Sequence, residues 1–399
     1  MNTPIRFALI AGVLASGLAV GLLIAGPLNP PGGAVASTYK TLTEVEPRIA
    51  VNATNTPGDA DSMYRITQPG SYYLTGNITG VTGKLGIEIA ASGVTLDLSG
   101  FTLTGSQTTL AGISYTPGSS TLGGATIRHG SVVGWGGNGI DLLGLGTAAL
   151  VEDVQANSNW LNGISISSFS AVVRACRTFQ NLQRGVVVFS DALVESCVFN
   201  SNGTGGLSGA NGVTVRTCTF RANAGEAVSL FMGGNVADCT VEGGGHGVHL
   251  TDQGSVTGCT IAGTFGSLGG ISVQNYCTVR HNTCSANDGG GIRAAAYCVI
   301  TDNTCATNTG SSGTVPGITA GSNNRIEANT VSSNNRGIVV TGTGCVIVRN
   351  IACSNSINYV LASGNRFGPI VVTALGGAVS GNTATSVLLT TDPWANFAY

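Results

Sequence analysis

The feature that most constrains this chain is a short repeat that opens with a glycine followed by an apolar residue. The pair recurs at intervals of 20 to 27 residues, once with alanine in place of glycine, at Gly86, Gly112, Gly139, Gly163, Gly185, Gly206, Ala227, Gly247, Gly270, Gly291, Gly317 and Gly337. A unit of this length cannot bury an apolar face alone, so successive units have to stack. Each unit alternates apolar and polar residues in three short stretches, such as residues 185–189, 193–195 and 197–199, as expected of three strands. The chain is therefore predicted to be all-β, a single-stranded right-handed parallel β-helix of about 12 coils with N- and C-terminal caps.

The low charge of the chain excludes a nucleic-acid surface. Asp, Glu, Lys and Arg make up 9% of the 399 residues and the formal net charge is -2. A protein that binds nucleic acid needs clustered Lys and Arg to replace the counterions of the phosphates. The 42% of hydrophobic residues supply a core, and the 61 glycines fit a chain with many tight turns. We therefore exclude nucleic acid as a partner.

The N-terminal segment indicates export. Arg6 precedes an apolar run over residues 7–28, and residues 34–36 are the small residues of a signal-peptidase site. The run is also long enough to span a bilayer if it is not cleaved. Residues 1–36 are therefore interpreted as a signal peptide or, alternatively, an N-terminal membrane anchor, and a membrane is a partner only in the second case. We expect the rest of the chain to be exported: secreted, periplasmic or on the cell surface.

Three further segments follow from the repeat. Residues 37–85 are predicted to form the N-terminal cap and the first coil, with a short capping helix over residues 41–48. Residues 86–356 carry the repeats. Residues 357–399 are predicted to form the last coil and the C-terminal cap. Both caps are needed because an open coil exposes unpaired strand edges and lumen side chains.

A second column of residues fixes the register of the coils. About 12 residues after each opening pair, the same position carries cysteine in five coils and then asparagine: Cys176, Cys197, Cys218, Cys239, Cys259, Asn282, Asn303, Asn329, Asn350 and, in the last coil, Asn382. In a parallel stack each residue lies about 4.8 Å above its counterpart. Buried thiols then pack as small apolar groups, and stacked amides hydrogen-bond along the axis. We interpret this column as a structural ladder.

Most of the eleven cysteines are expected to be buried thiols, because their number is odd and five share one column. Neighbouring coils place Cys277 near Cys298 and Cys284 near Cys305, and these are the candidate disulfides. A column of one residue type does not supply four converging ligands, so no metal site is predicted.

The outward face of the first strands carries mainly small hydroxyl residues. Its column reads Glu88, Ser114, Asp141, Ser165, Val187, Ser208, Ser229, His249, Ser272, Arg293, Thr319 and Val339. A glycoside hydrolase needs two carboxyl groups about 5–10 Å apart. Glu88 and Asp141 are two coils apart with Ser114 between them, and no acid pair is evident.

A polysaccharide lyase is the other enzymatic possibility. Arg293 would be its base, with Asp288 one turn away and His249 about 10 Å along the stack. Such a lyase would also need Ca²⁺, for which one carboxylate is not enough. We expect no cofactor outside this alternative.

Two phrases near the N-terminus resemble a known family. Residues 66–78, Ile-Thr-Gln-Pro-Gly-Ser-Tyr-Tyr-Leu-Thr-Gly-Asn-Ile, and residues 87–101 are similar to the N-terminal part of exported bacterial proteins of the right-handed β-helix repeat family, with pectate-lyase-like architecture. The resemblance implies the fold over residues 86–385 and leaves the function open. Gly245-His246-Gly247 resembles an element of polygalacturonases, but the aspartate and basic phrases of that family are absent, so His246 is interpreted as a turn residue.

Exposed aromatic side chains would mark a glycan-binding surface, because sugar rings stack on flat apolar faces. The candidates are Trp135, Trp160, Phe169, Phe189 and Phe231, and Phe189 and Phe231 occupy one column two coils apart. Trp135 and Trp160 are alternatively expected to pack under longer turns.

The sequence favours a non-catalytic binding or scaffold module for carbohydrate or cell-surface partners. The alternative is a polysaccharide lyase or glycoside hydrolase whose candidate residues are His249, Arg293, Asp288 and His246. A purely structural or self-associating element is a third possibility.

Overall fold

The computed structural model describes residues 46–116, 124–144, 149–310, 313–372 and 391–399. The chain divides into two compact units, Met1–Pro47 and Arg48–Tyr399, and every strand of the described residues lies in the second unit. The predicted signal peptide or anchor falls outside the described residues, and residues 46–48 of the predicted capping helix are not helical. None of the described segments is a helix long and apolar enough to cross a membrane.

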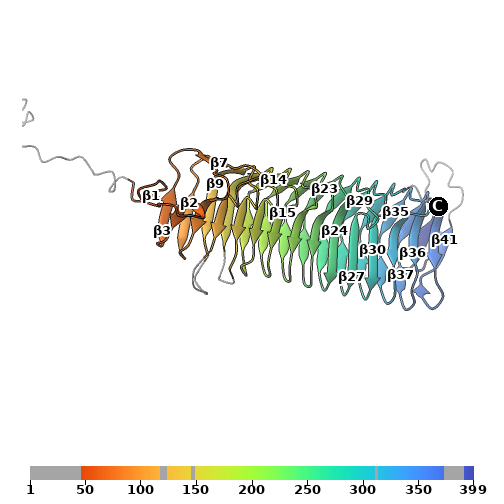
Figure 1. Cartoon of the computed structure of the whole chain (residues 1–399). Helices are drawn as coiled ribbons and strands as arrows, with labels where there is room; N and C mark the ends of the chain where they lie inside the picture. The colour runs from red at the N-terminus through yellow and green to blue at the C-terminus, as the bar shows by residue number, and fades with distance from the viewer. Residues whose placement is uncertain (1–45, 117–123, 145–148, 311–312, 373–390) are drawn as a thin grey trace, which may run out of the picture. The chain divides into compact units, whose positions relative to one another are not determined.

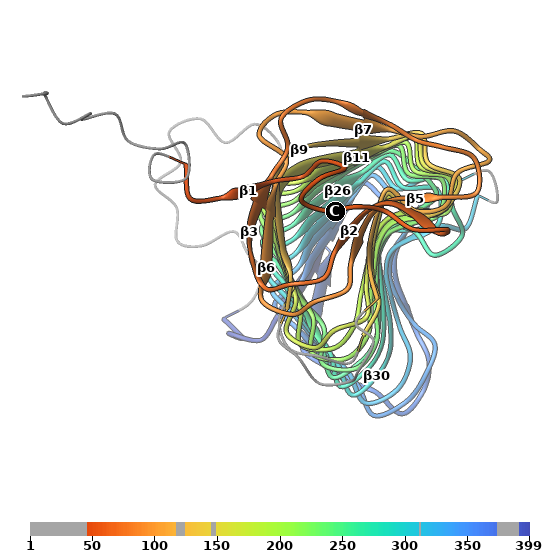
Figure 2. The same cartoon turned by 60° about the vertical axis from the view of Figure 1, so that its left-hand side comes forward.

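One parallel sheet takes a single strand from each coil and contains 14 strands. In order along the sheet they are β2 (Ser62–Ile66), β5 (Leu85–Ile89), β8 (Ile113–Tyr115), β10 (Ile140–Leu142), β12 (Ile164–Ile166), β15 (Arg184–Val188), β18 (Gly205–Gly209), β21 (Glu226–Leu230), β24 (His246–Asp252), β27 (Ile271–Asn275), β30 (Ile292–Ala296), β33 (Pro316–Ala320), β36 (Arg336–Val340) and β39 (Ile357–Leu361). Twelve of them lie at the predicted opening pairs, and β2 and β39 add one coil at each end. The predicted number of coils is thus close to the observed number. Figures 1 and 2 show these coils stacked over one another.

The other 28 strands form two further parallel ladders, which are joined through β9 and β11. The second strand of each coil belongs to the ladder β1 (Ile49–Ala50), β3 (Gly70–Tyr73), β6 (Val94–Asp97), β9 (Thr126–Val133), β11 (Leu150–Asn157), β13 (Val172–Arg174), β16 (Leu193–Glu195), β19 (Thr214–Arg216), β22 (Asn235–Ala237), β25 (Ser255–Thr257), β28 (Thr278–Arg280), β31 (Val299–Thr301), β34 (Arg325–Glu327), β37 (Val346–Val348) and β40 (Arg366–Phe367). The third strand belongs to β4 (Ile78–Thr79), β7 (Thr102–Thr104), β9, β11, β14 (Arg177–Phe179), β17 (Val198–Asn200), β20 (Thr219–Arg221), β23 (Thr240–Glu242), β26 (Thr260–Ala262), β29 (Thr283–Ser285), β32 (Thr304–Ala306), β35 (Thr330–Ser332), β38 (Ile351–Cys353), β42 (Asn396–Ala398) and β41 (Ile370–Val372).

The lumen of the stack is filled by alternate side chains of all three strands. In β15, Val186 and Val188 are buried and Val187 points outward, as strand geometry requires. Phe199 and Phe220 stack in the lumen with ring centroids 4.5 Å apart. The buried apolar residues form one cluster that extends from Val51 to Ile347. This continuous core explains why the repeats are stable only as a stack.

The predicted asparagine ladder is confirmed. Each side-chain amide of the ladder donates to the Oδ1 of the next one at 2.9–3.0 Å, from Asn282 through Asn303 and Asn329 to Asn350. The last acceptor is Asn396, which accepts from Nδ2 of Asn350 at 3.2 Å. Asn396 of β42 therefore holds the position for which Asn382 was predicted, because β42 pairs with β38, and that prediction was wrong; Asn382 itself lies outside the described residues.

The cysteine half of the ladder consists of buried thiols. The Sγ of Cys197 donates to the carbonyl oxygens of Glu195 and Val173 at 3.2 and 3.6 Å, and Cys218 does the same with its own neighbours. The adjacent Cys197 thiol, together with burial, raises the pKa of Cys218 to about 12. All eleven cysteines are free thiols in the structure, including the four of the candidate disulfides.

A second asparagine ladder runs five residues after the first, and the sequence analysis missed it. Its members are hydrogen-bonded through their side-chain amides, and all but the half-buried Asn355 are buried; they form two series, Asn159, Asn181, Asn202 and Asn223, and then Asn287, Asn308, Asn334 and Asn355. Between the series the equivalent positions are Gly244 and Thr264. The constant offset from the first ladder was the signal that could have revealed it.

We expect Asn303→Ala to lower the free energy of unfolding by about 3 kcal/mol, because buried partners that lose a hydrogen bond cost about 1–3 kcal/mol each. Asn303 accepts from Asn282 and donates to Asn329 and to the carbonyl oxygen of Val279. Chemical denaturation would measure the loss. Asn211→Ala, at an exposed position, is the matched control and should change the value by less than about 0.5 kcal/mol.

The burial of the thiols predicts their reactivity. Ten cysteines are buried and Cys353 is partly buried, so a thiol reagent should modify the native protein at Cys353 alone. All eleven should react after unfolding in guanidinium without reductant. A count of nine or seven in the unfolded protein would instead show that one or both candidate disulfides form.

Candidate functional site

The outward residues of the 14-stranded sheet form one continuous column. The strand register places Glu88, Ser114 and Asp141 in line at the N-terminal end of the sheet, and Ser229, His249, Ser272, Arg293 and Thr319 in line further along. The column predicted from the sequence is therefore correct in its order. Because neighbouring positions are one strand spacing apart, each candidate residue has a fixed height on the stack.

The two carboxyl groups of this column have different surroundings. Glu88 is buried, accepts from the Thr116 hydroxyl at 2.7 Å and pairs with Arg65 at 3.0 Å. Asp141 carries a buried Oδ1 without a hydrogen-bond partner, and burial raises the pKa of its carboxyl group. Ser114 separates the two along the column. Glu88 is thus held by structural partners and Asp141 is partly buried two coils away, so the two carboxyl groups do not form the acid pair of a hydrolase.

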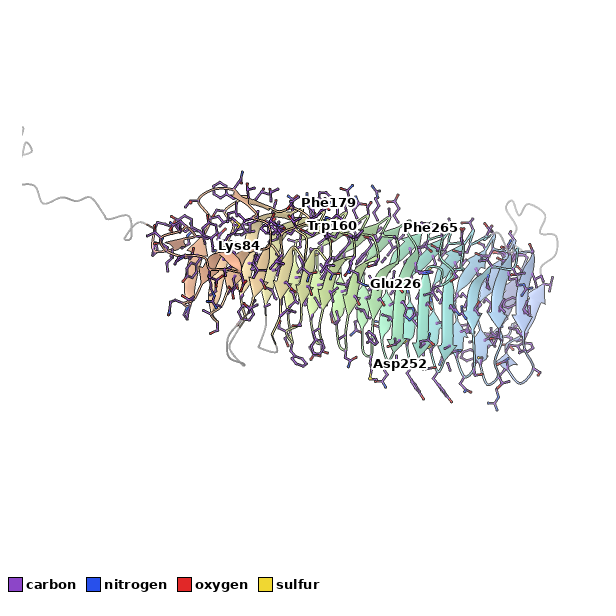
Figure 3. All side chains as sticks on the ribbon, in the orientation of Figure 1. Lys84, Trp160, Phe179, Glu226, Asp252 and Phe265 are labelled. Carbon is purple, nitrogen blue, oxygen red and sulfur yellow. The ribbon has the colours of Figure 1, made fainter. Side chains whose placement is uncertain are left out.

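A polar cluster lies at the middle of the sheet, where the first strand begins. Arg184 pairs with Glu226 two coils away at 3.2 Å and passes over Gly205, which has no side chain to block it. Burial alone would raise the pKa of Glu226, but backbone hydrogen bonding and the Arg184 guanidinium hold it below its usual value. Figure 3 shows Glu226 on the face of the stack.

Two histidines lie on β24, the strand of the coil that follows Glu226. His246 is the in-register neighbour of Glu226, and its Nδ1 accepts from the backbone N–H of Leu268 at 3.2 Å. His249 has a buried Nδ1 without a partner, and burial lowers its pKa. His246 is thus the first residue of β24 rather than a turn residue, and its side chain contacts the following coil at Leu268.

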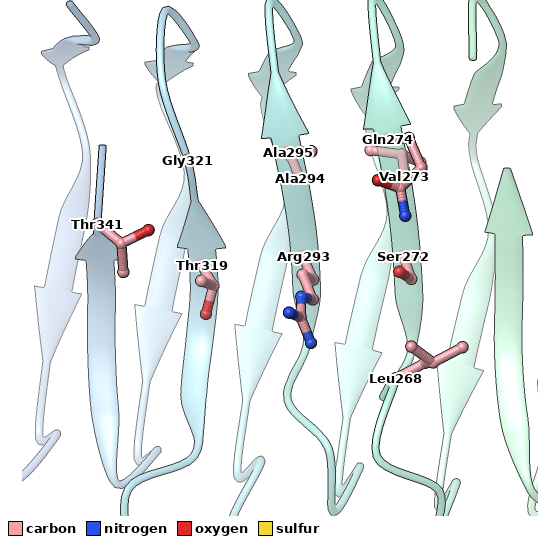
Figure 4. A pocket seen from close by; sticks show the side chains of 10 residues that line it. All are labelled: Leu268, Ser272, Val273, Gln274, Arg293, Ala294, Ala295, Thr319, Gly321 and Thr341. Atoms are coloured by element: carbon pink, nitrogen blue, oxygen red, sulfur yellow. The ribbon is translucent and has the colours of Figure 1, made fainter. Parts of the chain in front are cut away.

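A hollow of about 300 Å³ surrounds Arg293 (Figure 4). Arg293 on β30 lies between Ser272 on β27 and Thr319 on β33 in strand register. The hollow is lined by hydroxyl, amide and apolar groups and the Arg293 guanidinium, without a carboxylate. The lining residues are Leu268, Ser272, Val273, Gln274, Arg293, Ala294, Ala295, Thr319, Gly321 and Thr341. His249 and the exposed Asp288 do not line this hollow, so the structure does not assemble the predicted lyase set around Arg293.

The hollow exists because small residues interrupt one outward row. Gln274 and Thr341 stand at the ends of this row, with Ala295 and Gly321 between them. A Cβ atom at Gly321 would lie 2.2 Å from the carbonyl oxygen of Ala295, so that position accepts only glycine. The floor of the hollow is therefore fixed by the backbone.

Aromatic side chains line the edge of the stack that follows the first strands. Phe189 and Phe231 are exposed in one column with Ala210 between them, as predicted. Phe169 packs edge-to-face on Phe189 at 4.9 Å. We call Phe169, Phe189, Phe231, Tyr276 and Tyr297 the aromatic edge. In Figure 3, Asp252 at the end of β24 marks this edge and Phe265 lies on the opposite one.

The two tyrosines of the aromatic edge were missed by sequence reasoning. Tyr276 and Tyr297 stack with ring centroids 4.9 Å apart and an interplanar angle of 10°, and their side chains are 59% and 52% exposed. Both have a positive φ, of 57° and 58°, where the next coil has Asn323. The same turn position has a positive φ in the coils before and after, for example at Asp191, Gly233 and Gln253, so this conformation belongs to the turn of the fold. Their position directly before Cys277 and Cys298 was the available signal.

The two tryptophans have different surroundings. Trp135 is buried and donates from its indole N–H to the carbonyl oxygen of Leu103 at 3.1 Å. Trp160 is 42% exposed, so the expectation that it packs under a turn was wrong. Since Trp160 follows the third strand of its coil, it lies away from the aromatic edge.

The described residues contain no group of three or more His, Cys, Asp or Glu that holds a metal ion. The outer face of the 14-stranded sheet therefore combines an exposed aromatic edge, a column of hydroxyls and a hollow with one cation. Such a surface can stack, hydrogen-bond and attract a negative group.

Comparison with known proteins identifies the architecture. Residues 85–237 and 232–382 match the family model described as right handed beta helix region. A comparison with curated proteins finds no match. Among solved structures, the chain is similar to the A-module of mannuronan C-5 epimerase AlgE4 from Azotobacter vinelandii, with 18% identity, 80% of this chain and 87% of that chain covered, and a TM-score of 0.43.

Two further solved structures are similar over most of this chain. The Dettilon tailspike protein has 15% identity, with 73% of this chain and 58% of that chain covered and a TM-score of 0.41. PfbA, a surface adhesin of Streptococcus pneumoniae, has 9% identity, with 71% of this chain and 82% of that chain covered and a TM-score of 0.30.

We expect Asp141→Asn to stabilise the protein at pH 7, by about 1 kcal/mol, because the negative charge that burial disfavours is removed. The raised pKa means that the folded state loses stability as the pH rises above the unfolded value of 3.8. The gain should therefore vanish near pH 3, where the carboxyl group is neutral in both states. Thermal unfolding of both proteins at the two pH values would show it, and a destabilised variant at pH 7 would contradict it.

Proposed function

The chain belongs to the right-handed β-helix family, and on this premise we propose that it is an exported module that binds carbohydrate without cleaving it. The aromatic edge is the observation that carries the proposal. Its side chains are exposed in a protein with 6% aromatic residues, and they adjoin the outward column of hydroxyls. Exposed rings beside hydroxyl groups match the two kinds of surface that a sugar ring presents.

The physical basis is stacking on rigid platforms. A sugar ring has apolar C–H faces that pack on aromatic rings, and its hydroxyls exchange hydrogen bonds with Ser and Thr side chains. Phe189 is fixed by Phe169, and Tyr276 by Tyr297. Such preorganised side chains lose little conformational entropy when a ligand binds.

The spacing of the platforms favours an extended glycan. Phe189 and Phe231 are two coils apart in one row, and Tyr276 lies two coils after Phe231, two residues beyond the point where this row reaches Gln274. Two strand spacings are about 10 Å. This distance is close to the length of a disaccharide unit in an extended β-1,4-linked chain, so alternate rings of such a chain would meet a platform.

The arrangement of acids supports binding rather than cleavage. Glu88 is engaged by Arg65 and Thr116, and Asp141 is two coils away and partly buried. His249 is separated from Arg293 by Ser272. The lyase and hydrolase alternatives therefore lack a converging set of groups among the described residues.

Export is part of the proposal, since extracellular glycans and surface partners are met outside the cytoplasm. The apolar run over residues 7–28 with small residues at 34–36 supports a signal peptide. The low charge and the hydroxyl-rich face suit a polysaccharide, whose own surface is rich in hydroxyl groups.

We expect Phe231→Ala and Tyr276→Asn each to weaken binding of β-1,4-linked oligosaccharides about tenfold, the loss of one stacking platform. Asn is chosen at residue 276 because Asn323 adopts the same positive φ at the equivalent position two coils further along. Isothermal titration of the protein with oligosaccharides of increasing length would measure the affinity. Phe265→Ala, an exposed aromatic on the opposite edge, is the matched control and should bind as the unaltered protein does.

Two outcomes would overturn the proposal. Binding that is unaffected by both substitutions would show that the aromatic edge is not the site. Reducing ends or unsaturated sugars released from the glycan by the purified protein would show that it is an enzyme.

A further inference from the structure

We infer that the hollow around Arg293 is a subsite for an anionic sugar, and that the Arg293 guanidinium pairs with the carboxylate of a uronic acid or with a sulfate group. The inference rests on the proposed function, because the sugar would belong to a chain that lies on the aromatic edge. It adds the charge of the ligand, which the proposed function leaves open.

The first argument is the pairing of the arginines. In the described part of the chain nine arginines have a carboxylate within 4.0 Å: Arg48, Arg65, Arg128, Arg174, Arg184, Arg216, Arg221, Arg325 and Arg349. Arg293 has no such partner among the described residues, and neither have Arg177, Arg280, Arg336 and Arg366; Arg293 differs from these four in lining the hollow. It is also the one cationic group in a hollow that contains no carboxylate. A guanidinium in this setting has no internal anion to satisfy it.

The second argument is the set of neutral donors around the cation. Ser272 and Thr319 lie one strand spacing to either side of Arg293, and Gln274 and Thr341 stand at the ends of the neighbouring row. Hydroxyl and amide groups bind the ring hydroxyls of a sugar and share a charged oxygen with arginine. Arginine binds carboxylate and sulfate in a bidentate manner, which a single lysine does not.

The third argument is the size and place of the hollow. Its volume of about 300 Å³ lies at the lower end of ligand pockets, enough for one or two sugar rings. Gln274 and Ala295 line it, and Tyr276 and Tyr297 follow two residues later on the same two coils. The row of Phe189 and Phe231 also continues through Thr251 to Gln274 and Ala295, so a glycan that lies along this row reaches the hollow.

A polyphosphate chain is a poorer fit than an acidic glycan. The binding of a nucleic acid needs several cations along the backbone, and the chain carries a net charge of -2. One arginine among hydroxyls suits an isolated negative group on an otherwise neutral, hydroxyl-rich ligand.

The test compares three oligosaccharides of equal length on the full chain: a neutral β-1,4-linked gluco-oligosaccharide, a β-1,4-linked uronate oligosaccharide and a sulfated one. Isothermal titration should give tighter binding for at least one acidic oligosaccharide than for the neutral one. Arg293→Gln should weaken that binding about 10- to 100-fold, leave the neutral oligosaccharide unchanged and reduce the dependence of affinity on salt. Arg280→Gln, an exposed arginine of β28 on another sheet, is the matched control and should have no effect.

The outcomes separate this inference from the proposed function. If the acidic oligosaccharides bind as the neutral one does, or if Arg293→Gln leaves their affinity unchanged, the anionic subsite is wrong while binding that depends on Phe231 remains. If none of the three binds, both the proposed function and the subsite are wrong. A loss confined to the uronate or to the sulfated oligosaccharide identifies which anionic group the hollow takes. Circular dichroism of Arg293→Gln establishes that the variant is folded, as expected for an exposed residue.

Discussion

Backbone hydrogen bonding from one coil to the next is the constraint on which the rest of the structure depends. It holds the strands in parallel register, so every side chain lies one strand spacing from its equivalent in the neighbouring coil. A buried polar group is then tolerated only when the adjacent coil supplies a partner. Asn303 satisfies this condition, since it accepts from the coil before and donates to the coil after. The buried thiols satisfy it differently, by donating to backbone carbonyls.

Both asparagine ladders are interrupted in the middle of the stack, while the apolar core continues through this region. Between Cys239 and Thr264 neither column carries an asparagine, and Gly244 takes the amide position with a φ of 95°. Val241 and Ile261 still pack in the lumen there, and the strand pairing is unbroken. Apolar packing and backbone bonds therefore connect two segments that are each reinforced by amide ladders. The two matches to the family model also meet near this point, at residues 232–237.

The same register places exposed charged side chains of neighbouring coils beside one another on the outer face. Carboxylates and arginines that stand in line on adjacent coils neutralise each other, as Glu195 and Arg216 do. Arg293 has no carboxylate beside it in the column, because its neighbours there are Ser272 and Thr319. The functional proposals rest on this face of the stack: a cation in a hollow lined without a carboxylate, and exposed aromatic rings beside a column of hydroxyls.

The sequence by itself determined the repeat, the register of the first ladder and the order of the outward column, because a parallel stack converts spacing along the chain directly into height. Phe189 and Phe231 were placed in one column for the same reason. Only the tertiary structure decided the features that depend on the turns and the caps, because the lengths of these segments vary from coil to coil. It placed Asn396 at the end of the first ladder, partly buried Asp141, exposed Trp160 and opened the hollow at Gly321. Side-chain direction and burial at these points come from contacts between distant residues, which spacing does not encode.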